Sequence, residues 1–261
     1  MTQPAPGSDA RPPEEPQSVQ VEVRNRQGQR PWVVYALLAT TISVFLLQLG
    51  TQDPRLAING MACGNLPTCI GVKINQLILE GQWWRLITPI LLHGSLLHLG
   101  FNMYALYVLG PEVEHHYGHL TFLVLYLLSG FSGVVLSFMF TVQPSLGASS
   151  SIFGMLAAHA VFVFRNRNIF GVQGQAVMRS ILNVALINLL ISLTPGVDGW
   201  GHLGGAIGGG LFAGLAAPQY KIEKDENGYF LANQTSAGYV WLASLVVLIL
   251  FAGLTAVRLL S

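Results

Sequence analysis

The stretch Gly147-Ala148-Ser149-Ser150-Ser151-Ile152-Phe153-Gly154 places three adjacent serines between glycines at the start of an apolar run. A serine hydroxyl at its free pKa is a weak nucleophile, so it needs a base within hydrogen-bond reach. The candidate base is His202, in the glycine-rich stretch Gly199-Trp200-Gly201-His202-Leu203-Gly204-Gly205. We therefore take Ser149 as a candidate nucleophile and His202 as its partner.

Composition decides the solvent in which this chemistry takes place. Of 261 residues, 52% are hydrophobic and only 10% are charged, whereas a soluble domain carries about 25% charged residues. The sequence therefore predicts a polytopic membrane protein. Its net charge of +1 gives no reason to expect a nucleic-acid partner.

Seven apolar runs are long enough to cross a bilayer. They are Trp32–Leu49, Ile90–Leu109, Leu120–Val142, Ser149–Phe164, Val177–Leu193, Trp200–Ala217 and Val240–Val257. The segment before the first run, up to about Arg30, is rich in proline and polar residues and is expected to be disordered. It lacks the basic start and short apolar region of a cleavable signal peptide, so we expect the first run to be retained.

Lysine and arginine predict the orientation of the spans. If the amino-terminal tail is cytoplasmic, 9 of the 13 basic residues fall on the inner side. The second, fourth and sixth runs then begin at the outer face, so Ser149 and His202 lie at similar depth. Residues 149–164 cover 16 positions, about 24 Å of helix against an apolar core of about 30 Å. Ser149 is therefore expected below the outer surface, within the membrane.

The second run contributes His93, His98 and Asn102. His98 and Asn102 are four residues apart and share a helix face. Hydrolysis by a serine passes through a tetrahedral oxyanion, which hydrogen-bond donors stabilise. The alternative role is to hold helices together. We favour oxyanion stabilisation for Asn102 and a structural role for His93, and leave both roles open for His98.

Four separated motifs now stand in order: Trp84-Arg85, His98-x-x-x-Asn102, Gly147-Ala148-Ser149 and His202-Leu203-Gly204-Gly205. With them the chain resembles the rhomboid family of intramembrane serine proteases. Two positions depart from the family pattern: Ser150 stands where glycine is usual, and Gly201 where alanine is usual. Both residues are small, so close approach of the helices is retained.

The resemblance implies an all-α polytopic membrane protein with a six-helix catalytic core. Its expected parts are a disordered cytoplasmic tail (residues 1–31), the core (32–217), a cytoplasmic linker (218–238) and a seventh transmembrane helix (239–261). It assigns Ser149 as nucleophile and His202 as general base and acid. The oxyanion hole is assigned to His98, Asn102 and the backbone N–H of Ser149, with no cofactor or metal.

No buried carboxylate completes a triad in this family. The sequence is consistent with that, because Asp198 is the acid nearest a span and every glutamate is expected in a tail or loop. Asp198 stands four residues before His202, so it could orient the imidazole. The alternative, which we favour, is that Asp198 caps the sixth helix.

Four further residues are expected to support the site. Phe153, four residues after Ser149, shares its helix face and should form a wall for His202. Gly205 belongs to a series of glycines at four-residue spacing that allows close helix packing, and Gly147 precedes Ser149 in the motif. Arg85 is interpreted as a buried anchor of the loop between the first two helices.

The remaining cysteines and histidines leave alternatives open. Cys63 and Cys69 lie in that same loop, on the expected oxidising side, and either form a local disulfide or stay as two thiols. His115, His116 and His119 could bind a metal in a short inner loop. A solvated loop is the better interpretation, because no cysteine or carboxylate set accompanies them.

The predicted function is an intramembrane serine endopeptidase that cuts transmembrane segments of membrane proteins near their outer end. Its partners would be transmembrane protein substrates and the lipid bilayer, without nucleic acid or metal, and its oligomeric state is open. We expect it in the plasma (inner) membrane, with a cytoplasmic amino terminus and the active site opening outward. One rival is a non-catalytic relative that binds or escorts membrane helices; a transporter is disfavoured because no internal repeat is found.

Overall fold

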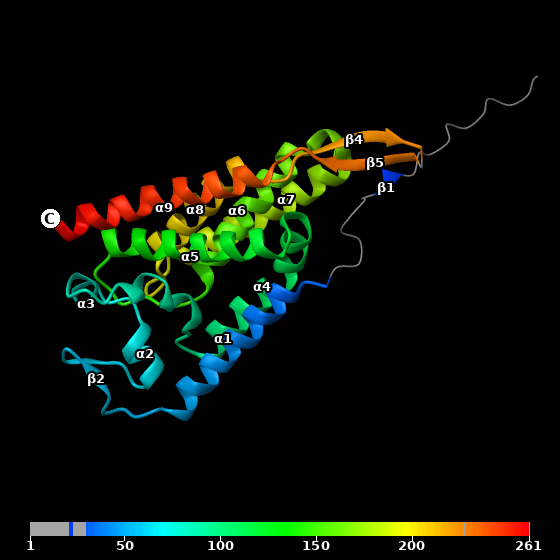
Figure 1. Ribbon diagram of the computed structural model, residues 1–261. Helices are drawn as coiled ribbons and strands as arrows, with labels where there is room; N and C mark the ends of the chain where they lie inside the picture. Colours follow the sequence, from blue (N-terminus) through cyan, green and yellow to red (C-terminus); the bar gives the residue numbers. More distant parts are fainter. Residues whose placement is uncertain (1–20, 23–29, 227, 261) are drawn as a thin grey trace, which may run out of the picture.

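The computed structural model describes residues 21–22, 30–226 and 228–260, and it is built mainly of helices (Figure 1). Each of the seven predicted apolar runs overlaps a long helix. These are α1 (Trp32–Gly50), α4 (Leu96–Tyr117), α5 (His119–Phe140), α6 (Ser149–Arg165), α7 (Arg167–Ser192), α8 (Gly199–Ala216) and α9 (Ala237–Leu260). The expected disordered tail, 1–31, lies almost wholly outside the described residues.

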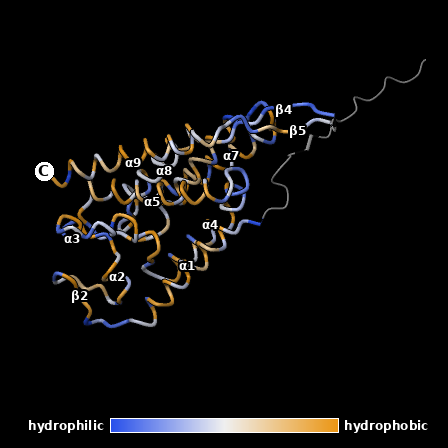
Figure 2. Tube along the Cα trace, in the orientation of Figure 1, coloured by the Kyte–Doolittle hydropathy of each residue, from blue (hydrophilic) through white to orange (hydrophobic). Residues whose placement is uncertain are grey.

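The helices mark a multi-pass membrane protein. By length and hydropathy, α1, α5, α7 and α9 could each cross a bilayer, and α6 is a shorter apolar helix. Apolar residues colour most of the helical part of the chain, whereas hydrophilic ones are prominent on the strand β4 (Tyr220–Asp225) (Figure 2). Glycines and polar residues interrupt α4 and α8, so the division into six spans plus one stays a prediction.

Helix α5 forms the centre of the bundle. Of the 18 residues in its apolar stretch, 72% are buried, whereas the corresponding fraction is 28% in α1 and α9 and 11% in α7. The first turn of α1 lies against the last turns of α4, where the Glu114 carboxylate accepts the backbone N–H groups of Val33 (3.0 Å) and Val34 (2.8 Å). These are donors that a helix start leaves unpaired.

The buried Glu114 corrects one expectation, because it lies inside α4 and not in a tail or loop. It occupies the last turns of α4, whereas Ser149 begins α6 near the opposite end of the bundle. Glu114 is therefore too far along the bundle to orient His202.

Glycine rows on α8 set the packing of the central helices. A Cβ at Gly209 would lie 2.4 Å from the carbonyl oxygen of Gly154 on α6, and one at Gly204 would lie 2.6 Å from that of Ser132 on α5. The close approach expected from the glycine spacing is thus confirmed. The structure adds that the two rows face two different helices.

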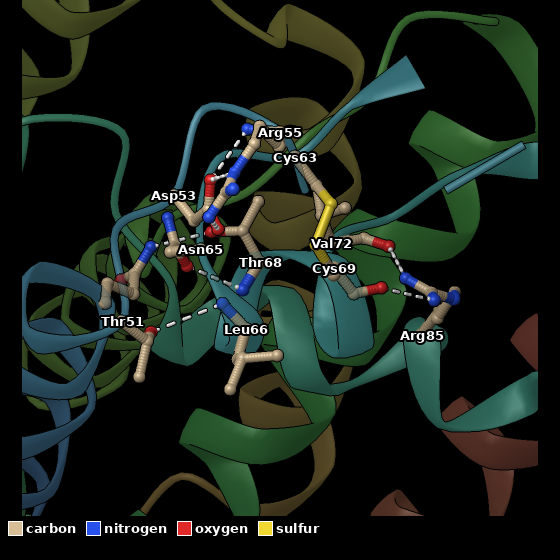
Figure 3. Close-up of a disulfide and its surroundings, with 11 residues drawn as sticks. Thr51, Asp53, Arg55, Cys63, Asn65, Leu66, Thr68, Cys69, Val72 and Arg85 are labelled. Atoms are coloured by element: carbon tan, nitrogen blue, oxygen red, sulfur yellow. Dashed lines mark hydrogen bonds and ion pairs between the residues drawn. A yellow bond between two sulfur atoms is a disulfide. The ribbon is translucent and has the colours of Figure 1, made fainter. Parts of the chain in front are cut away.

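The segment between α1 and α4 folds into short elements at the Ser149 end of the bundle. They are β2 (Ala57–Ile58), β3 (Met61–Ala62), α2 (Leu66–Gly71), α3 (Asn75–Leu79) and the 3-10 turns Trp83–Leu86 and Thr88–Leu91. Figure 3 shows the Cys63–Cys69 disulfide beside Arg85. The buried Arg85 guanidinium donates to the carbonyl oxygens of Val72 (2.8 Å) and Cys69 (2.7 Å), which confirms it as the anchor of this loop.

Three boundaries differ from the sequence prediction. Helix α4 begins at Leu96 and not at Ile90, because the Ser95 side chain caps it by accepting the N–H of His98 (3.1 Å). Its other end reaches Tyr117, so His115 and His116 are helical, and His119 opens α5; the predicted loop shrinks to Gly118. Helix α7 begins ten residues before Val177, at Arg167, and bends at Gly171, where φ is 50°.

The expected linker 218–238 is not unstructured. It contains an antiparallel hairpin of β4 (Tyr220–Asp225) and β5 (Gly228–Asn233), and β1 (Val21–Glu22) pairs in parallel with β5. The hairpin projects from one end of the bundle (Figure 1), beside the end of α6, where the N–H of Tyr220 donates to Asn166 Oδ1 (2.8 Å); Ser149 lies at the other end of α6. The fold is therefore mostly helical, with a small sheet that the all-α prediction did not contain.

Candidate active site

The structure brings Ser149 and His202 together. Ser149 is the first residue of α6 and His202 lies in the first turn of α8, and the distance from His202 Nε2 to Ser149 Oγ is 2.8 Å. Gly205, one turn below His202, allows this approach, since a Cβ there would lie 2.0 Å from the carbonyl oxygen of Ser150. Both side chains are half-buried, so a substrate could still reach the hydroxyl.

The three adjacent serines face different neighbours. Of these three serines, Ser149 is the one that lies at hydrogen-bond distance from the His202 ring. Ser150 is buried against Gly133 of α5, so closely that a Cβ atom added at Gly133 would lie 2.4 Å from the Cβ atom of Ser150. Ser151 is buried against Gly130, one turn away on α5. Glycines on α5 thus accommodate the two extra hydroxyls, and the geometry agrees with the register that selects Ser149.

Gly147 shapes the backbone just before the nucleophile. Its φ of 130° is one that side-chain-bearing residues rarely adopt, and a Cβ there would lie 2.7 Å from His98 Nε2. Gly147 also donates its N–H to the carbonyl oxygen of Pro89 (2.9 Å). The His98 imidazole therefore lies directly beside the segment that presents Ser149.

Asn102 and His93 lie on either side of His98. The buried Asn102 side chain donates from Nδ2 to the His98 carbonyl oxygen of its own helix (3.0 Å). The buried His93 ring packs edge-on against His98 at 5.0 Å, and its backbone is held by Gln48 of α1 through two bonds of 3.1 Å. His93 thus sits in a packed interface, as expected, and the oxyanion role of His98 and Asn102 stays a prediction.

Besides Ser149, two residues contact the imidazole of His202. Phe153 of α6 stacks on its ring with centroids 4.4 Å apart and an angle of 14°, as the four-residue spacing predicted. Asp198 does not orient it: Asp198 Oδ1 accepts the N–H of Gly201 (2.9 Å), so the predicted helix cap is confirmed. The second ring nitrogen, Nδ1, meets Ser192 Oγ at 2.5 Å.

Sequence reasoning missed Ser192. This serine lies ten residues before His202, in the last turn of α7, and nothing in its local sequence indicates a functional contact. The only available signal was its position on the same face as Asn188, four residues earlier.

A second missed residue is Lys73, a fully buried lysine in the loop between α1 and α4. Its Nζ donates to the carbonyl oxygens of Thr141 (2.8 Å) and Gln143 (3.0 Å), and its backbone pairs with Ser145. Burial lowers the pKa of Lys73 to about 8, although the negative charge of Asp198 opposes that shift. Lys73 thereby fastens the connection that leads from α5 to Gly147.

The side chains that could bind a metal are dispersed over the part of the chain that the structure describes. Within residues 30–226 and 228–260, no group of three or more His, Cys, Asp or Glu side chains is placed to hold a metal ion. His159 lies too deep in α6 for the chemistry at Ser149, and its Nε2 is 3.4 Å from Glu112 of α4. The side chains gathered near the start of α6 are those of a serine, two histidines and an asparagine.

Comparison with known proteins gives a family match over the same region. Residues 80–219 match the family described as the Rhomboid domain, a stretch that covers more than half of the chain and contains all four motifs. RHOMBOID-like protein 6, mitochondrial, of Arabidopsis thaliana is 32% identical over 235 residues, which cover 78% of this chain and 76% of that protein.

Two further relatives are much longer than the region they share with this chain. Rhomboid protease GluP of Bacillus subtilis (strain 168) is 39% identical over 193 residues, which cover 73% of this chain and 36% of that protein. RHOMBOID-like protein 9, chloroplastic, of Arabidopsis thaliana is 33% identical over 165 residues, which cover 63% of this chain and 38% of that protein. The activities of those whole proteins remain properties of those proteins.

Proposed function

This chain belongs to the rhomboid family, and on that premise we propose that it is an intramembrane serine endopeptidase. The observation that carries the proposal is the 2.8 Å distance between His202 Nε2 and Ser149 Oγ, which joins residues 53 positions apart. A nucleophile and a base within hydrogen-bond reach are the minimum that acyl transfer through serine needs. A helix-binding protein without activity would need neither.

The proposed reaction begins when His202 Nε2 accepts the Ser149 hydroxyl proton while Oγ attacks the scissile carbonyl carbon. The tetrahedral intermediate then collapses, the carbon–nitrogen bond breaks, and the leaving amine takes the proton from His202. A water molecule next gives its proton to Nε2 and attacks the ester carbon. Collapse of this second intermediate releases the carboxyl product and returns the proton to Ser149.

Stabilisation of the oxyanion is assigned to His98, Asn102 and the backbone N–H of Ser149. The Ser149 N–H is a free donor by position, because the first N–H groups of a helix have no intrahelical partner. His98 lies beside Gly147 and can donate towards the same point. The Asn102 amide now donates to its own helix (3.0 Å), so we expect it to turn towards the oxyanion when substrate binds.

The proposed orientation places Ser149 and the disulfide-bearing loop on the outer side. Distribution of the basic residues favours a cytoplasmic amino terminus, and a disulfide is typical of an oxidising compartment. The hairpin of β4 and β5, at the opposite end of the bundle, would then face the cytoplasm. The substrates would be membrane proteins whose transmembrane segments are cut near their outer ends, in the plasma (inner) membrane.

A serine-reactive fluorophosphonate probe tests the proposal directly. The full-length protein in membranes should be labelled, with the modified peptide containing Ser149, and Ser149→Ala should remove the label. The same preparation should cleave a model transmembrane substrate. The rival function, binding or escort of membrane helices without catalysis, predicts no labelling and no cleavage, and that result would overturn the proposal.

A further inference from the structure

The two ring nitrogens of His202 contact hydroxyl groups from two different helices. Nε2 is 2.8 Å from Ser149 Oγ on α6, and Nδ1 is 2.5 Å from Ser192 Oγ at the end of α7. Ser192 Oγ in turn lies 2.7 Å from the carbonyl oxygen of Asn188, one turn earlier on α7. The four groups form one hydrogen-bonded chain from the backbone of α7 to the candidate nucleophile.

The direction of this chain follows from counting protons. A carbonyl oxygen only accepts, so the single hydroxyl proton of Ser192 points to Asn188. Towards His202 the Ser192 oxygen can then only accept, which requires the proton of the neutral imidazole to be on Nδ1. The other nitrogen, Nε2, is left with a lone pair, and that lone pair faces the Ser149 hydroxyl.

This arrangement supplies what an acid supplies in the usual catalytic triad, where a carboxylate holds the imidazole in the correct tautomer and orientation. Asp198 is the nearby carboxylate, but it caps α8 through Gly201 and makes no hydrogen bond to the ring. The Asp198 carbonyl oxygen accepts the backbone N–H of His202 (3.1 Å), but that bond does not hold the ring. Of the hydrogen-bonding groups described around Nδ1, Ser192 is the one in contact.

We propose that Ser192 is a positioning residue of this enzyme, which holds His202 in the tautomer that can accept the Ser149 proton. The inference rests on the proposed function. It also makes α7 part of the site: α8 carries the base, α6 supplies the Phe153 ring on its face, and α7 supplies the hydroxyl at Nδ1.

The first test is kinetic and uses three variants in the full-length protein. Ser192→Ala should lower kcat about 10- to 100-fold, part of what general-base catalysis contributes, with KM unchanged. Ser192→Thr should restore kcat, because a helical threonine hydroxyl can bond to the carbonyl four residues back. The control is Ser244→Ala in α9: Ser244 is also 9% exposed and also donates to the i−4 carbonyl (2.7 Å), but it lies outside the site.

The second test needs no substrate and reads the tautomer itself. In protein carrying 15N-labelled histidine, the His202 signals, identified by their loss in His202→Gln, should show a protonated Nδ1. Ser192→Ala should give a mixture of tautomers, while Ser192→Thr and Ser244→Ala should keep the wild-type pattern. Thermal unfolding of each variant in detergent checks that Ser192→Ala is folded.

These two tests separate the inference from the function on which it rests. If the wild-type protein is labelled at Ser149 and Ser192→Ala has normal kcat and an unchanged 15N pattern, the role of Ser192 is overturned and the protease proposal stands. If the wild-type protein neither reacts with the probe nor cleaves substrate, the protease proposal falls, and the role of Ser192 in catalysis falls with it. A selective loss of kcat with a changed tautomer, restored by threonine, supports the inference.

If Ser192→Ala does not fold, Ser192→Thr decides: normal kcat and a protonated Nδ1 support the role of Ser192, and their loss overturns it.

Discussion

Helices α8 and α7 both contact the candidate site, but they are attached to the bundle in opposite ways. Along α8, glycine after glycine meets the backbone or a small side chain of α5 or α6, so that even one methyl group would overlap at Gly205 or Gly209. Along α7, large apolar side chains face outward, as at Leu189 (56% exposed) and Leu190 (58%). The nucleophile and the base thus lie on the closely packed pair, and the helix that faces lipid contributes one hydroxyl.

The two steps that involve His202 differ in how accurately the groups must be positioned. Proton transfer between Ser149 and His202 requires a fixed distance, and backbone-to-backbone packing is the least deformable way to fix it. Orientation of the imidazole requires only a hydrogen bond, which a more loosely packed helix can supply.

The largest effect is expected from the pair itself. Ser149→Ala and His202→Ala should each lower kcat on the order of a million-fold, because nucleophile and base act as a unit, and the double variant should lose no more than either single one. Cleavage of a model transmembrane substrate in bilayers measures this. Ser150→Ala is the matched control and should retain most activity, since Ser150 faces Gly133 and not His202; an inactive Ser150→Ala with an active Ser149→Ala would show that the register is wrong.

Two glycines of α8 test the packing directly. Gly205→Ala places a methyl group 2.0 Å from a carbonyl oxygen of α6, whereas at Gly214 nothing lies within 4 Å. Ordinary overpacking costs about 1–3 kcal/mol, and Gly205→Ala should exceed that, because backbone on one side cannot move aside. Gly214→Ala should be neutral or stabilising by about 0.5–1 kcal/mol. Thermal unfolding in detergent and cleavage rates compare them; equal behaviour of the two variants would contradict the rigid packing of α8.

Residues with a local or motif signal were predicted from the sequence. The seven helices follow from apolar runs, Phe153 from its four-residue spacing to Ser149, and the glycine rows of α8 from their period. The cap at Asp198 follows from its position just before an apolar run. In each case the physical cause lies within a turn or two of helix, so the sequence contains it.

Residues that depend on distant contacts were not predicted. Ser192 gains its meaning from His202 on another helix, and Lys73 is buried only because a connection 68 residues later supplies carbonyl groups. A lysine in a loop is usually exposed, so the residue type alone predicts an exposed side chain at position 73, where the structure has a buried one. The hairpin was missed although its signal was present: apolar Tyr220 and Ile222 alternate with charged residues ahead of a turn that reaches Gly228.

Variants of Asn102 and His93 should distinguish a role in catalysis from a role in helix packing. Both residues lie beside the packed pair of α6 and α8, Asn102 on α4 and His93 in the loop before it. Loss of an oxyanion donor costs about 100- to 1000-fold in kcat, whereas a hydrogen bond between membrane helices contributes about 0.6 kcal/mol on average. Asn102→Ala should therefore keep near-normal KM and thermal stability while kcat falls steeply. His93→Ala should lower stability more than kcat, because its ring is buried and packs against that of His98. An Asn102→Ala protein that is unstable yet turns over normally at low temperature would make Asn102 a structural residue.

The smallest effect is expected outside the helices, at Lys73, which fastens the outer loop to the connection before Ser149. Burial lowers the pKa of Lys73 from 10.5 to about 8, so between these pH values the unfolded chain binds more protons than the folded one, and stability should rise with pH. Between about pH 7 and pH 9 the rise amounts to about 1 kcal/mol. Lys73→Met should lack this rise, and Lys221→Met, which removes an exposed lysine of β4, should keep it. Thermal unfolding of the three proteins across that pH range measures the difference; a Lys73→Met protein that gains as much stability as wild type would mean that this lysine is solvated in the folded protein, and that the loop is held to the packed bundle by other contacts.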